Sequence, residues 1–381
     1  MTITMPSPIP VMIPWIGDEE ANAAADAVRS GWIAQGPRVA AFESAFAAYV
    51  GAQEAVAVSS CTTGLHLALK ILGIARGDEV VVPSFSFVAT ANAVTYAEAT
   101  PVFADVDPIT GNVTASTIAA ALTPATRAVI AVHQAGVPLD LDEVHSLCDP
   151  LGIPVIEDAA CAIGTLYQQH RVGGGNSLAV FSFHPRKLLT TGEGGMITTS
   201  NSEWATRLRR LREHGMSMSA ADRHAAGAVA PESYLEIGFN YRMTDVQAAI
   251  GMVQLAKIEE LLRHRRTQAE RYRDAFRDLD WLRSVDDPPH GRTNFQSFWV
   301  ELDPHLDVTR DEVLERLRAQ AISPRRGIMA AHLEPAYAGV SHVPLPNTER
   351  LTRHTLVLPL YHTLTAGQQD RVITALVEAA Q

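Results

Sequence analysis

Lys187 is the residue whose type and position first suggest chemistry. It lies in the stretch "FSFHPRKLLTTGEGG" (residues 181–195), shortly after an apolar run that reads as a strand. The chain has only three lysines, Lys70, Lys187 and Lys257, whereas the other 28 of its 31 basic residues are arginines. An amine that forms an imine must lose its proton before it attacks, and we expect an enclosed site to lower its pKa. Most lysines are simply exposed, but Lys70 and Lys257 fall inside helical patterns, so Lys187 is the candidate for imine chemistry.

Small hydroxyl residues follow an earlier predicted strand. Residues 59–64 read "SSCTTG" and open a helical pattern, so Thr62 and Thr63 stand in its first turn. The first backbone N–H groups of a helix have no partner inside the helix and can bind an anion. Plain capping of the helix by Ser or Thr is the alternative, and it is common.

Glu157 and Asp158 come directly after the apolar run at 153–156. A carboxylate is costly to bury unless it meets a cation or a donor, and a protonated pyridine nitrogen would be such a partner; a helix cap or a surface ion pair is the alternative. Phe87, which alone reads as a core residue, follows another strand. In chain order, the strand ends thus carry an anion cradle, an aromatic, an acid and a lysine. Together they describe a site for pyridoxal 5′-phosphate (PLP), whose ring acts as an electron sink.

The elements that must position these residues alternate along the chain. Seven apolar runs read as strands and are separated by helical patterns; the runs are 54–60, 77–87, 100–107, 126–134, 153–160, 177–184 and 194–200. This alternation predicts an α/β fold with a mostly parallel sheet that is covered on both faces. Ligands of such sheets bind beyond the carboxyl ends of the strands, so the candidate residues should meet there.

The length of 381 residues favours two domains. We expect an extended, proline-containing arm at 1–15, a large PLP-binding domain at 16–255 and a small C-terminal domain at 256–381. One long helical pattern at 244–276 should connect the two domains, and 216–234 reads as a surface loop.

The net charge, the apolar runs and the cysteine spacing argue against several classes of protein. The net charge of −11 and the lack of a dense basic run argue against a nucleic-acid partner. The sequence contains no run of about 20 apolar residues, so we expect no membrane span. The N-terminus lacks the basic start of a signal peptide. The three cysteines have no metal-ligand spacing, so we expect no metal site and a reducing, cytoplasmic location.

Several longer segments form a pattern that is more specific than any one motif. They include "SSCTTGLHLAL", "GDEVVVPSFSFVATANAV", "IPVIEDAACAIGT", "FSFHPRKLLTTGEGGMITT" and "GFNYRMTDVQAAIG". Over nearly the whole chain, this combination resembles the DegT family of nucleotide-sugar aminotransferases, which are PLP enzymes of fold type I. The resemblance implies a large domain with a mostly parallel seven-stranded sheet between helices, and a smaller C-terminal α+β domain.

The resemblance also implies roles for the candidate residues. Lys187 would hold PLP covalently as an imine and move the proton during amino transfer. Asp158 would pair with the pyridine nitrogen, and Phe87 would stack on the ring. The implied phosphate ligands are Thr62, Thr63 and Ser182 of one subunit and Asn240 of the partner subunit. The active form is therefore expected to be a homodimer with shared active sites.

Two segments depart from the family pattern. Cys161 stands where relatives often carry Gln or His against the cofactor, and it is counted as a cofactor contact. In "SPRRGIMAAHLEPAY" (323–337) the usual histidine–aromatic pair is missing, which leaves Arg326 and His332 as candidates for substrate contact. A solvated arginine is the alternative for Arg326. Trp32, in a segment that lies near the nucleotide sugar in the family, and His184, beside the cofactor region, are further candidates; Trp32 could equally be a packing residue.

The resemblance implies transamination, because this sequence keeps Lys187. A subgroup of this fold has histidine in place of that lysine, and its members are dehydratases. The resemblance implies glutamate as the donor, which becomes 2-oxoglutarate, and a keto group of a nucleotide-linked sugar as the acceptor. Amination of a keto-cyclitol or another small ketone is the alternative. A catalytically silent regulator with this fold is a third hypothesis, against which the retained Lys187 and Asp158 speak.

Overall fold

The computed structural model describes residues 7–176, 178–218 and 233–381. The first six residues of the predicted arm and most of the predicted loop at 216–234 lie outside the described residues. Among the described helices, none is long and apolar enough to cross a membrane.

The centre of the molecule is a seven-stranded sheet with the order β2-β10-β9-β6-β5-β3-β4. Its strands are β2 (Glu54–Val58), β3 (Glu79–Pro83), β4 (Thr100–Ala104), β5 (Thr126–Val132), β6 (Val155–Asp158), β9 (Ala179–Ser182) and β10 (Gly195–Thr199). Each lies within one of the seven predicted runs. Only β10 runs antiparallel to its neighbours, β2 and β9, while the other pairs are parallel. The predicted α/β fold with a mostly parallel sheet is confirmed.

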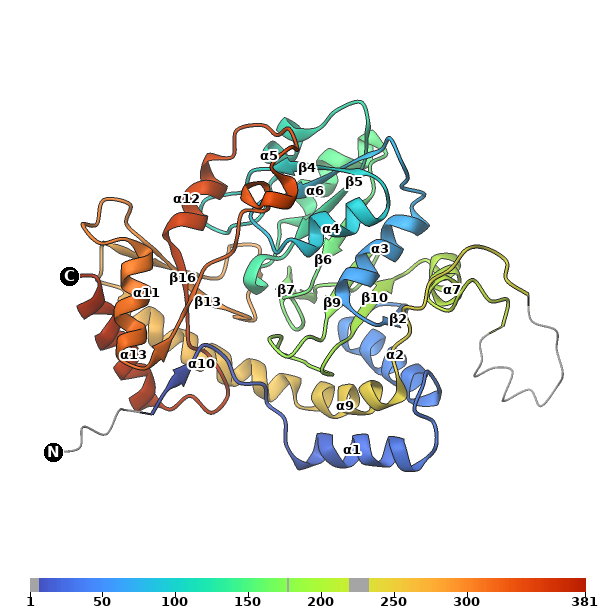
Figure 1. The fold of residues 1–381 in the computed structure, drawn as a ribbon, viewed down its shortest axis with the longest axis horizontal. Helices are drawn as coiled ribbons and strands as arrows, with labels where there is room; N and C mark the ends of the chain where they lie inside the picture. The colour runs from blue at the N-terminus through green and yellow to red at the C-terminus, as the bar shows by residue number, and fades with distance from the viewer. Residues whose placement is uncertain (1–6, 177, 219–232) are drawn as a thin grey trace.

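Helices cover both faces of this sheet. Successive strand residues point to opposite sides, and alternate residues of β3 pack against different helices. Val80 and Val82 of β3 pack in one core cluster with α3, α4 and α7, whereas Val81 packs in another with α5 and α6. These helices are α3 (Cys61–Ile71), α4 (Ala89–Tyr96), α5 (Ala115–Ala121), α6 (Leu141–Cys148) and α7 (Ser202–Leu211). A third cluster joins α2 (Pro37–Val50) to β9 and β10. Figure 1 shows this arrangement of helices around the sheet.

The long helix predicted at 244–276 is two helices, α9 (Asp245–Ala256) and α10 (Ile258–Phe276), which meet at Lys257. Lys257 keeps a nearly helical backbone, and its amino group pairs with Glu19 and Glu20 of α1 (Asp18–Arg29) at 2.9 and 2.8 Å. No proline or glycine marks the junction, so the helical periodicity could not reveal it. Figure 1 shows α9 above α1 and α10 leading towards the C-terminal elements.

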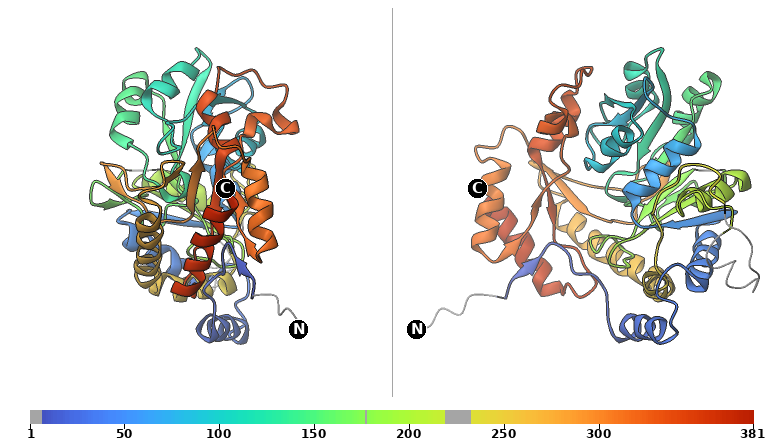
Figure 2. Two further views of the ribbon diagram at one scale, coloured as in Figure 1. Left: turned by 90° about the vertical axis from the view of Figure 1, so that its left-hand side faces the viewer. Right: turned by 45° about the vertical axis from the view of Figure 1, so that its right-hand side comes forward.

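The C-terminal elements form a second, antiparallel sheet with the order β11-β13-β16-β15. Its strands are β11 (Leu282–Ser284), β13 (Phe298–Leu302), β16 (Thr355–Leu358) and β15 (Arg325–Arg326), and its helices are α11 (Arg310–Ala319), α12 (Pro346–His354) and α13 (Ala366–Ala379). The right-hand view of Figure 2 places these orange and red elements together on one side of the molecule. Part of the N-terminal arm joins them, because β1 (Ile9–Pro10) pairs in parallel with β14 (Ile322–Ser323).

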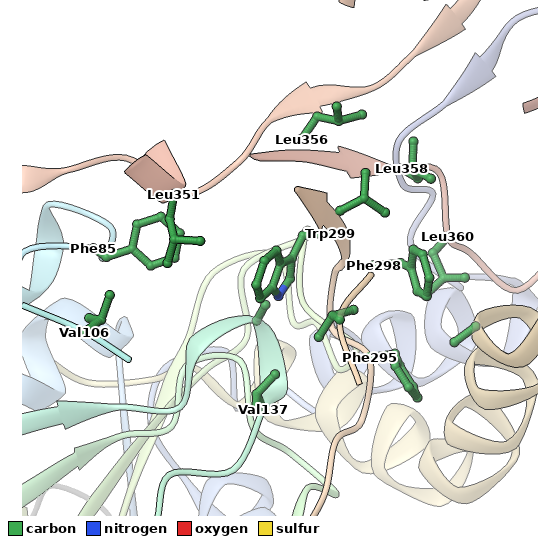
Figure 3. Close-up of a cluster of buried hydrophobic side chains, with 14 of the residues drawn as sticks. Phe85, Val106, Val137, Phe295, Phe298, Trp299, Leu351, Leu356, Leu358 and Leu360 are labelled. Atoms are coloured by element: carbon green, nitrogen blue, oxygen red, sulfur yellow. The ribbon is translucent and has the colours of Figure 1, made fainter. Parts of the chain in front are cut away.

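One hydrophobic cluster spans the two sheets. It contains Phe85, Val106 and Val137 from the first half of the chain together with Trp299 and Leu356 from the second sheet, all 3% exposed or less. Figure 3 shows these side chains and their neighbours at this junction. The domain limits of 1–15, 16–255 and 256–381 remain predictions, and the expected boundary at 255/256 falls close to the junction of α9 and α10.

Candidate active site

Asp158, the last residue of β6, is buried at the carboxyl end of the large sheet, with 5% of its surface exposed. The Thr90 hydroxyl donates a hydrogen bond of 2.8 Å to its Oδ2, and the Ala160 N–H donates one of 3.1 Å to its Oδ1. Burial raises the pKa of this carboxyl, although the two hydrogen bonds and the charge of Lys187 oppose that shift. A cationic ring nitrogen that reached this carboxylate would stabilise its charged form.

Lys187 lies in the turn after β9, where its N–H donates to the His184 carbonyl at 2.8 Å. Its Nζ donates to the Cys161 Sγ at 3.0 Å. Burial alone would lower the pKa of the Lys187 amine, but the influence of Cys161, followed by Cys61 and Asp158, outweighs it and holds the pKa above its usual value. The expected lowered pKa is therefore wrong for this structure, because the sequence did not reveal which groups face the amine.

The first turn of α3 offers donors for an anion. Ser60 caps the helix by accepting the Thr63 N–H, and the Thr63 hydroxyl donates back to the Ser60 carbonyl at 2.8 Å. Within the part of the chain that the structure describes, the Cys61 and Thr62 N–H groups and the Thr62 hydroxyl have no hydrogen-bond partner. Capping and anion binding are thus both possible here, because they use different groups of the same turn.

Gly195 brings this turn close to the end of β9. It pairs with Val58 of β2 on one side and with Ser182 of β9 on the other. A Cβ atom on Gly195 would lie 2.7 Å from the Ser60 carbonyl carbon and 2.8 Å from the Cys61 nitrogen. Only glycine at position 195 therefore allows the N-terminus of α3 to approach β10 so closely. Ser182 lies on the neighbouring strand, opposite Gly195.

Cys61 links this cradle to the acid, since its Sγ lies 3.9 Å from Asp158 Oδ1 and 3.7 Å from the Val180 carbonyl. Burial, followed by the nearby Asp158 charge, raises the pKa of the Cys61 thiol well above its usual value. Cys61 is thus a neutral thiol at physiological pH. The cradle, the acid and the lysine belong to one site.

Phe87 is the remaining candidate for a contact with the cofactor ring. It lies in the turn that leads into α4, and 64% of its surface is exposed. The Thr90 N–H donates to the Phe87 carbonyl at 3.2 Å, so the turn that presents the aromatic ring also supplies the hydroxyl on Asp158. The residues fit PLP: unpaired donors for a phosphate, an exposed aromatic face for a ring, a buried acid for a ring nitrogen and an amine for an imine.

Comparison with known proteins agrees with this reading. The model of the DegT/DnrJ/EryC1/StrS aminotransferase family matches residues 14–377. The chain belongs to this family. It is therefore a PLP-dependent transaminase.

Three solved members are similar over almost their full lengths. The aminotransferase TlmJ from Streptoalloteichus hindustanus is 36% identical, with a TM-score of 0.89, over 97% of this chain and 98% of that one. DesV from S. venezuelae, solved in complex with a ketimine intermediate, is 33% identical over 99% of both chains, with a TM-score of 0.89. DesI, solved in the presence of its TDP-sugar product, is 33% identical over 99% of this chain and 94% of that one, also with a TM-score of 0.89.

The remaining predicted residues of this aminotransferase lie in different surroundings. Asn240 is exposed and forms a β-bridge with Glu213. His184 is half-buried, and its Nδ1 accepts the Arg186 N–H at 3.1 Å. Trp32 is half-buried, and its ring lies 2.7 Å from where a Cβ atom on Gly36 would stand.

Arg326 and His332, the two candidates of the departing segment, differ in exposure. Arg326 is exposed on β15. His332 is only 6% exposed, and its Nδ1 lies 2.6 Å from the Ser84 hydroxyl. His332 is thus bonded inside the protein, and its role in substrate contact, like that of the other three candidates, stays a prediction.

Two polar contacts at this edge of the sheet were not predicted. Thr90 supports Asp158, yet a threonine within a helical pattern gives no signal of such a role. His133 and Glu157 are both buried and lie 3.0 Å apart, joining the ends of β5 and β6. Since the Leu139 N–H donates to His133 Nδ1, the proton of this imidazole sits on Nε2 and faces the Glu157 carboxylate.

Proposed function

We propose that this transaminase moves an amino group from glutamate to a keto group of a nucleotide-linked sugar, as a cytoplasmic homodimer with shared active sites. The observation that carries the proposal is a set of side chains that fits PLP, with Asp158 and Lys187 beside the first turn of α3, in a chain similar to DesI, which was solved in the presence of its TDP-sugar product. That relative supports the substrate class, and the net charge of −11 is consistent with the lack of a nucleic-acid partner.

Each part of the site would have one task. PLP, when bound, supplies an electron sink for the carbon that loses or gains a proton. Asp158 would keep the ring nitrogen charged, because a buried carboxylate stabilises a cation in contact with it. The first turn of α3, together with Ser182 and Asn240 of the partner subunit, would fix the phosphate, and Phe87 would cover one face of the ring.

Lys187 would be the acid and base of the transfer. Its Nζ lies in the same site as the acid and the cradle, so it can carry a proton between the two carbons that flank the transferred nitrogen once it is free. The contact with Cys161 at 3.0 Å gives the free amine a polar partner. Trp32, His184, Arg326 and His332 are proposed to contact the sugar nucleotide.

The test supplies glutamate with a panel of UDP-, dTDP- and GDP-linked keto-sugars and with keto-cyclitols. We expect turnover, with release of 2-oxoglutarate, on at least one nucleotide keto-sugar. Lys187→Ala should abolish both turnover and the imine absorbance band of bound PLP, whereas Lys70→Ala, the matched lysine control, should retain both. Turnover confined to the cyclitols would move the proposal to small ketones, and an imine band without turnover on any ketone would favour a regulator.

A further inference from the structure

Residues 294–296, "NFQ", form a buried segment between β12 (Gly291–Arg292) and β13. Asn294, Phe295 and Gln296 are only 0%, 1% and 6% exposed. The segment comes more than a hundred residues after Lys187 in the chain, yet its polar side chains bond to backbone groups of the active site. Buried amide side chains must satisfy both their donor and their acceptor, so the partners of these two residues are informative.

Gln296 bonds to the peptide groups on both sides of Lys187. Its Nε2 donates to the Arg186 carbonyl at 2.7 Å, and its Oε1 accepts the Leu188 N–H at 3.0 Å. One side-chain amide therefore fixes the two residues that flank the reactive amine. Its donor and acceptor suit this arrangement, because they match one carbonyl and one N–H.

Asn294 holds the loop that faces Lys187. Its Nδ2 donates to the carbonyls of Cys161 and Ile163 at 2.8 and 2.9 Å, and its Oδ1 accepts the Gln296 N–H at 2.8 Å. Gly136 makes room for this side chain, since a Cβ there would lie 1.8 Å from Asn294 Oδ1. The segment thus holds both Lys187 and the loop of Cys161, whose sulfur contacts the Lys187 amine.

Arg265 of α10 fixes the shape of the segment itself. It is 2% exposed, and its guanidinium donates to the carbonyls of Phe295 at 2.8 Å, Gln296 at 2.7 Å and Leu360 at 3.0 Å. Among the described residues no carboxylate pairs with it, and burial lowers the pKa of Arg265 to about 9. Phe295 has a φ of +50°, a conformation that L-residues rarely adopt. A buried cation bonded only to carbonyls is costly, and here it holds a strained turn in place.

We propose that Gln296 is a positioning residue that sets the place of the Lys187 amine by bonding both neighbouring peptide groups. The inference rests on the proposed role of Lys187 as the cofactor lysine, but its first test does not require PLP or substrate. Because the Gln296 side chain hydrogen-bonds only to backbone groups among the residues that the structure describes, its removal should change the behaviour of Lys187 while every side chain of the site stays present.

The experiment compares Gln296→Met with Gln268→Met. Gln268 is the matched control, because it is 8% exposed and donates to two carbonyls, those of Tyr361 and Leu364, rather than to the peptide groups beside Lys187. In the protein without cofactor, amide hydrogen exchange at Leu188 should accelerate at least about tenfold in Gln296→Met and not in Gln268→Met. With PLP added, imine formation and kcat should fall about 10- to 100-fold only in Gln296→Met, with KM little changed.

Gln296→Glu provides a second variant should Gln296→Met fold poorly. It keeps the oxygen that accepts the Leu188 N–H but loses the donor to Arg186, so its effect on both readouts should be intermediate, again relative to Gln268→Glu. Unchanged exchange at Leu188 in both Gln296 variants, or equal losses in the Gln268 variants, would overturn the proposal. Faster exchange at Leu188 without any imine in the wild-type protein would instead contradict the proposed cofactor role while upholding the contact.

Discussion

The contact with Cys161 is the largest of the influences that raise the pKa of the Lys187 amine, ahead of Cys61 and Asp158. Removing the sulfur in Cys161→Ala leaves only Cys61 and Asp158 to oppose burial, which lowers the pKa of a lysine. We therefore expect the pKa of Lys187, which lies above its usual value in the wild type, to fall in Cys161→Ala without cofactor. With only three lysines, titration of ¹³C-methylated lysines by NMR gives few signals, and Lys187→Arg identifies the relevant one.

The sign of the accompanying stability effect follows from linkage. A lysine whose pKa is raised on folding stabilises the protein fully below its unfolded pKa of about 10.4, and that stabilisation is lost as pH rises through the folded value. The melting temperatures of wild type and Cys161→Ala should therefore converge above that range. The signals of Lys70 and Lys257 serve as internal controls and should not move; an unchanged or higher pKa of Lys187 would contradict the expectation.

Substitutions of Asp158 and Thr90 should distinguish the effect of the carboxylate charge from the effect of the hydrogen bond that Thr90 donates to it. Asp158→Asn keeps the size of the side chain but removes the charge that would pair with the ring nitrogen, so kcat should fall about 10²- to 10³-fold. Thr90→Val leaves the charge in place and removes the hydrogen bond of 2.8 Å to the carboxylate, together with the contact of 3.1 Å to the Ser86 hydroxyl. A hydrogen bond to a charged acceptor corresponds to about 1.5–3 kcal/mol. Steady-state kinetics with saturating PLP measure both; an equal or larger loss in Thr90→Val would argue against the assigned role of Asp158.

The sequence singles out candidate residues of the site more readily than the side chains that contact them. Asp158 could be singled out as a candidate because an acid at the end of an apolar run is costly to bury without a partner. Lys187 could be singled out because it is one of only three lysines and follows a strand, whereas the other two fall inside helical patterns. Thr90, His133 and Gln296 could not be singled out, because their types are ordinary for their local patterns and their roles depend on residues far away in the chain. The predicted lowering of the Lys187 pKa was wrong for the same reason, since Cys161 faces the amine only in the folded chain.

At the scale of elements, the close approach of α3 to β10 builds the anion cradle. Gly195→Ala places a Cβ within 2.8 Å of backbone atoms of Ser60 and Cys61, which cannot move aside as a flexible side chain would. We expect a loss of about 1–3 kcal/mol in stability and a weaker affinity for PLP. Urea unfolding and PLP titration provide the measurements.

Gly367→Ala is the matched control for this substitution. Gly367 lies in α13 with no atom near its missing Cβ, so alanine there should leave PLP affinity unchanged and stabilise the helix by up to about 1 kcal/mol. Unchanged PLP affinity in Gly195→Ala would show that the approach of α3 to β10 does not shape the phosphate site.

All seven strands of the large sheet were predictable, because each is a short apolar run set between helical patterns. The break between α9 and α10 was not, since Lys257 is a good helix former and its backbone stays nearly helical. The pairing of β1 with β14 is likewise absent from any local pattern, because it joins residues more than three hundred positions apart.

At the scale of the whole molecule, the second sheet and the large sheet share a core. Trp299 and Leu356 pack in the same cluster as Phe85 and Val137 (Figure 3), and segment 294–296 bonds to the Lys187 turn. The C-terminal elements therefore support the site directly. Sequence periodicity assigns residues to elements but does not show which elements share a core, so the limits proposed for the two domains remain predictions.

The proposed homodimer makes one prediction that a monomer cannot fulfil. In a mixed dimer of Lys187→Ala and Asn240→Ala subunits, one of the two sites would combine an intact Lys187 with the intact Asn240 of the partner subunit. Random exchange gives mixed dimers in half of the molecules, so about a quarter of the wild-type sites should be restored. Asn240 is exposed in the single chain, as an intersubunit contact requires.

The control mixes Lys187→Ala with Asp158→Asn. Both residues lie in the same site of one chain, where Asp158 is among the charges that raise the pKa of Lys187, so neither site of that mixed dimer is complete and no activity should return. Activity per subunit is measured after subunit exchange has been verified with differently tagged chains. Equal activity in the two mixtures, or none above the Asn240→Ala baseline in the first, would show that Asn240 does not complete the site of the partner subunit.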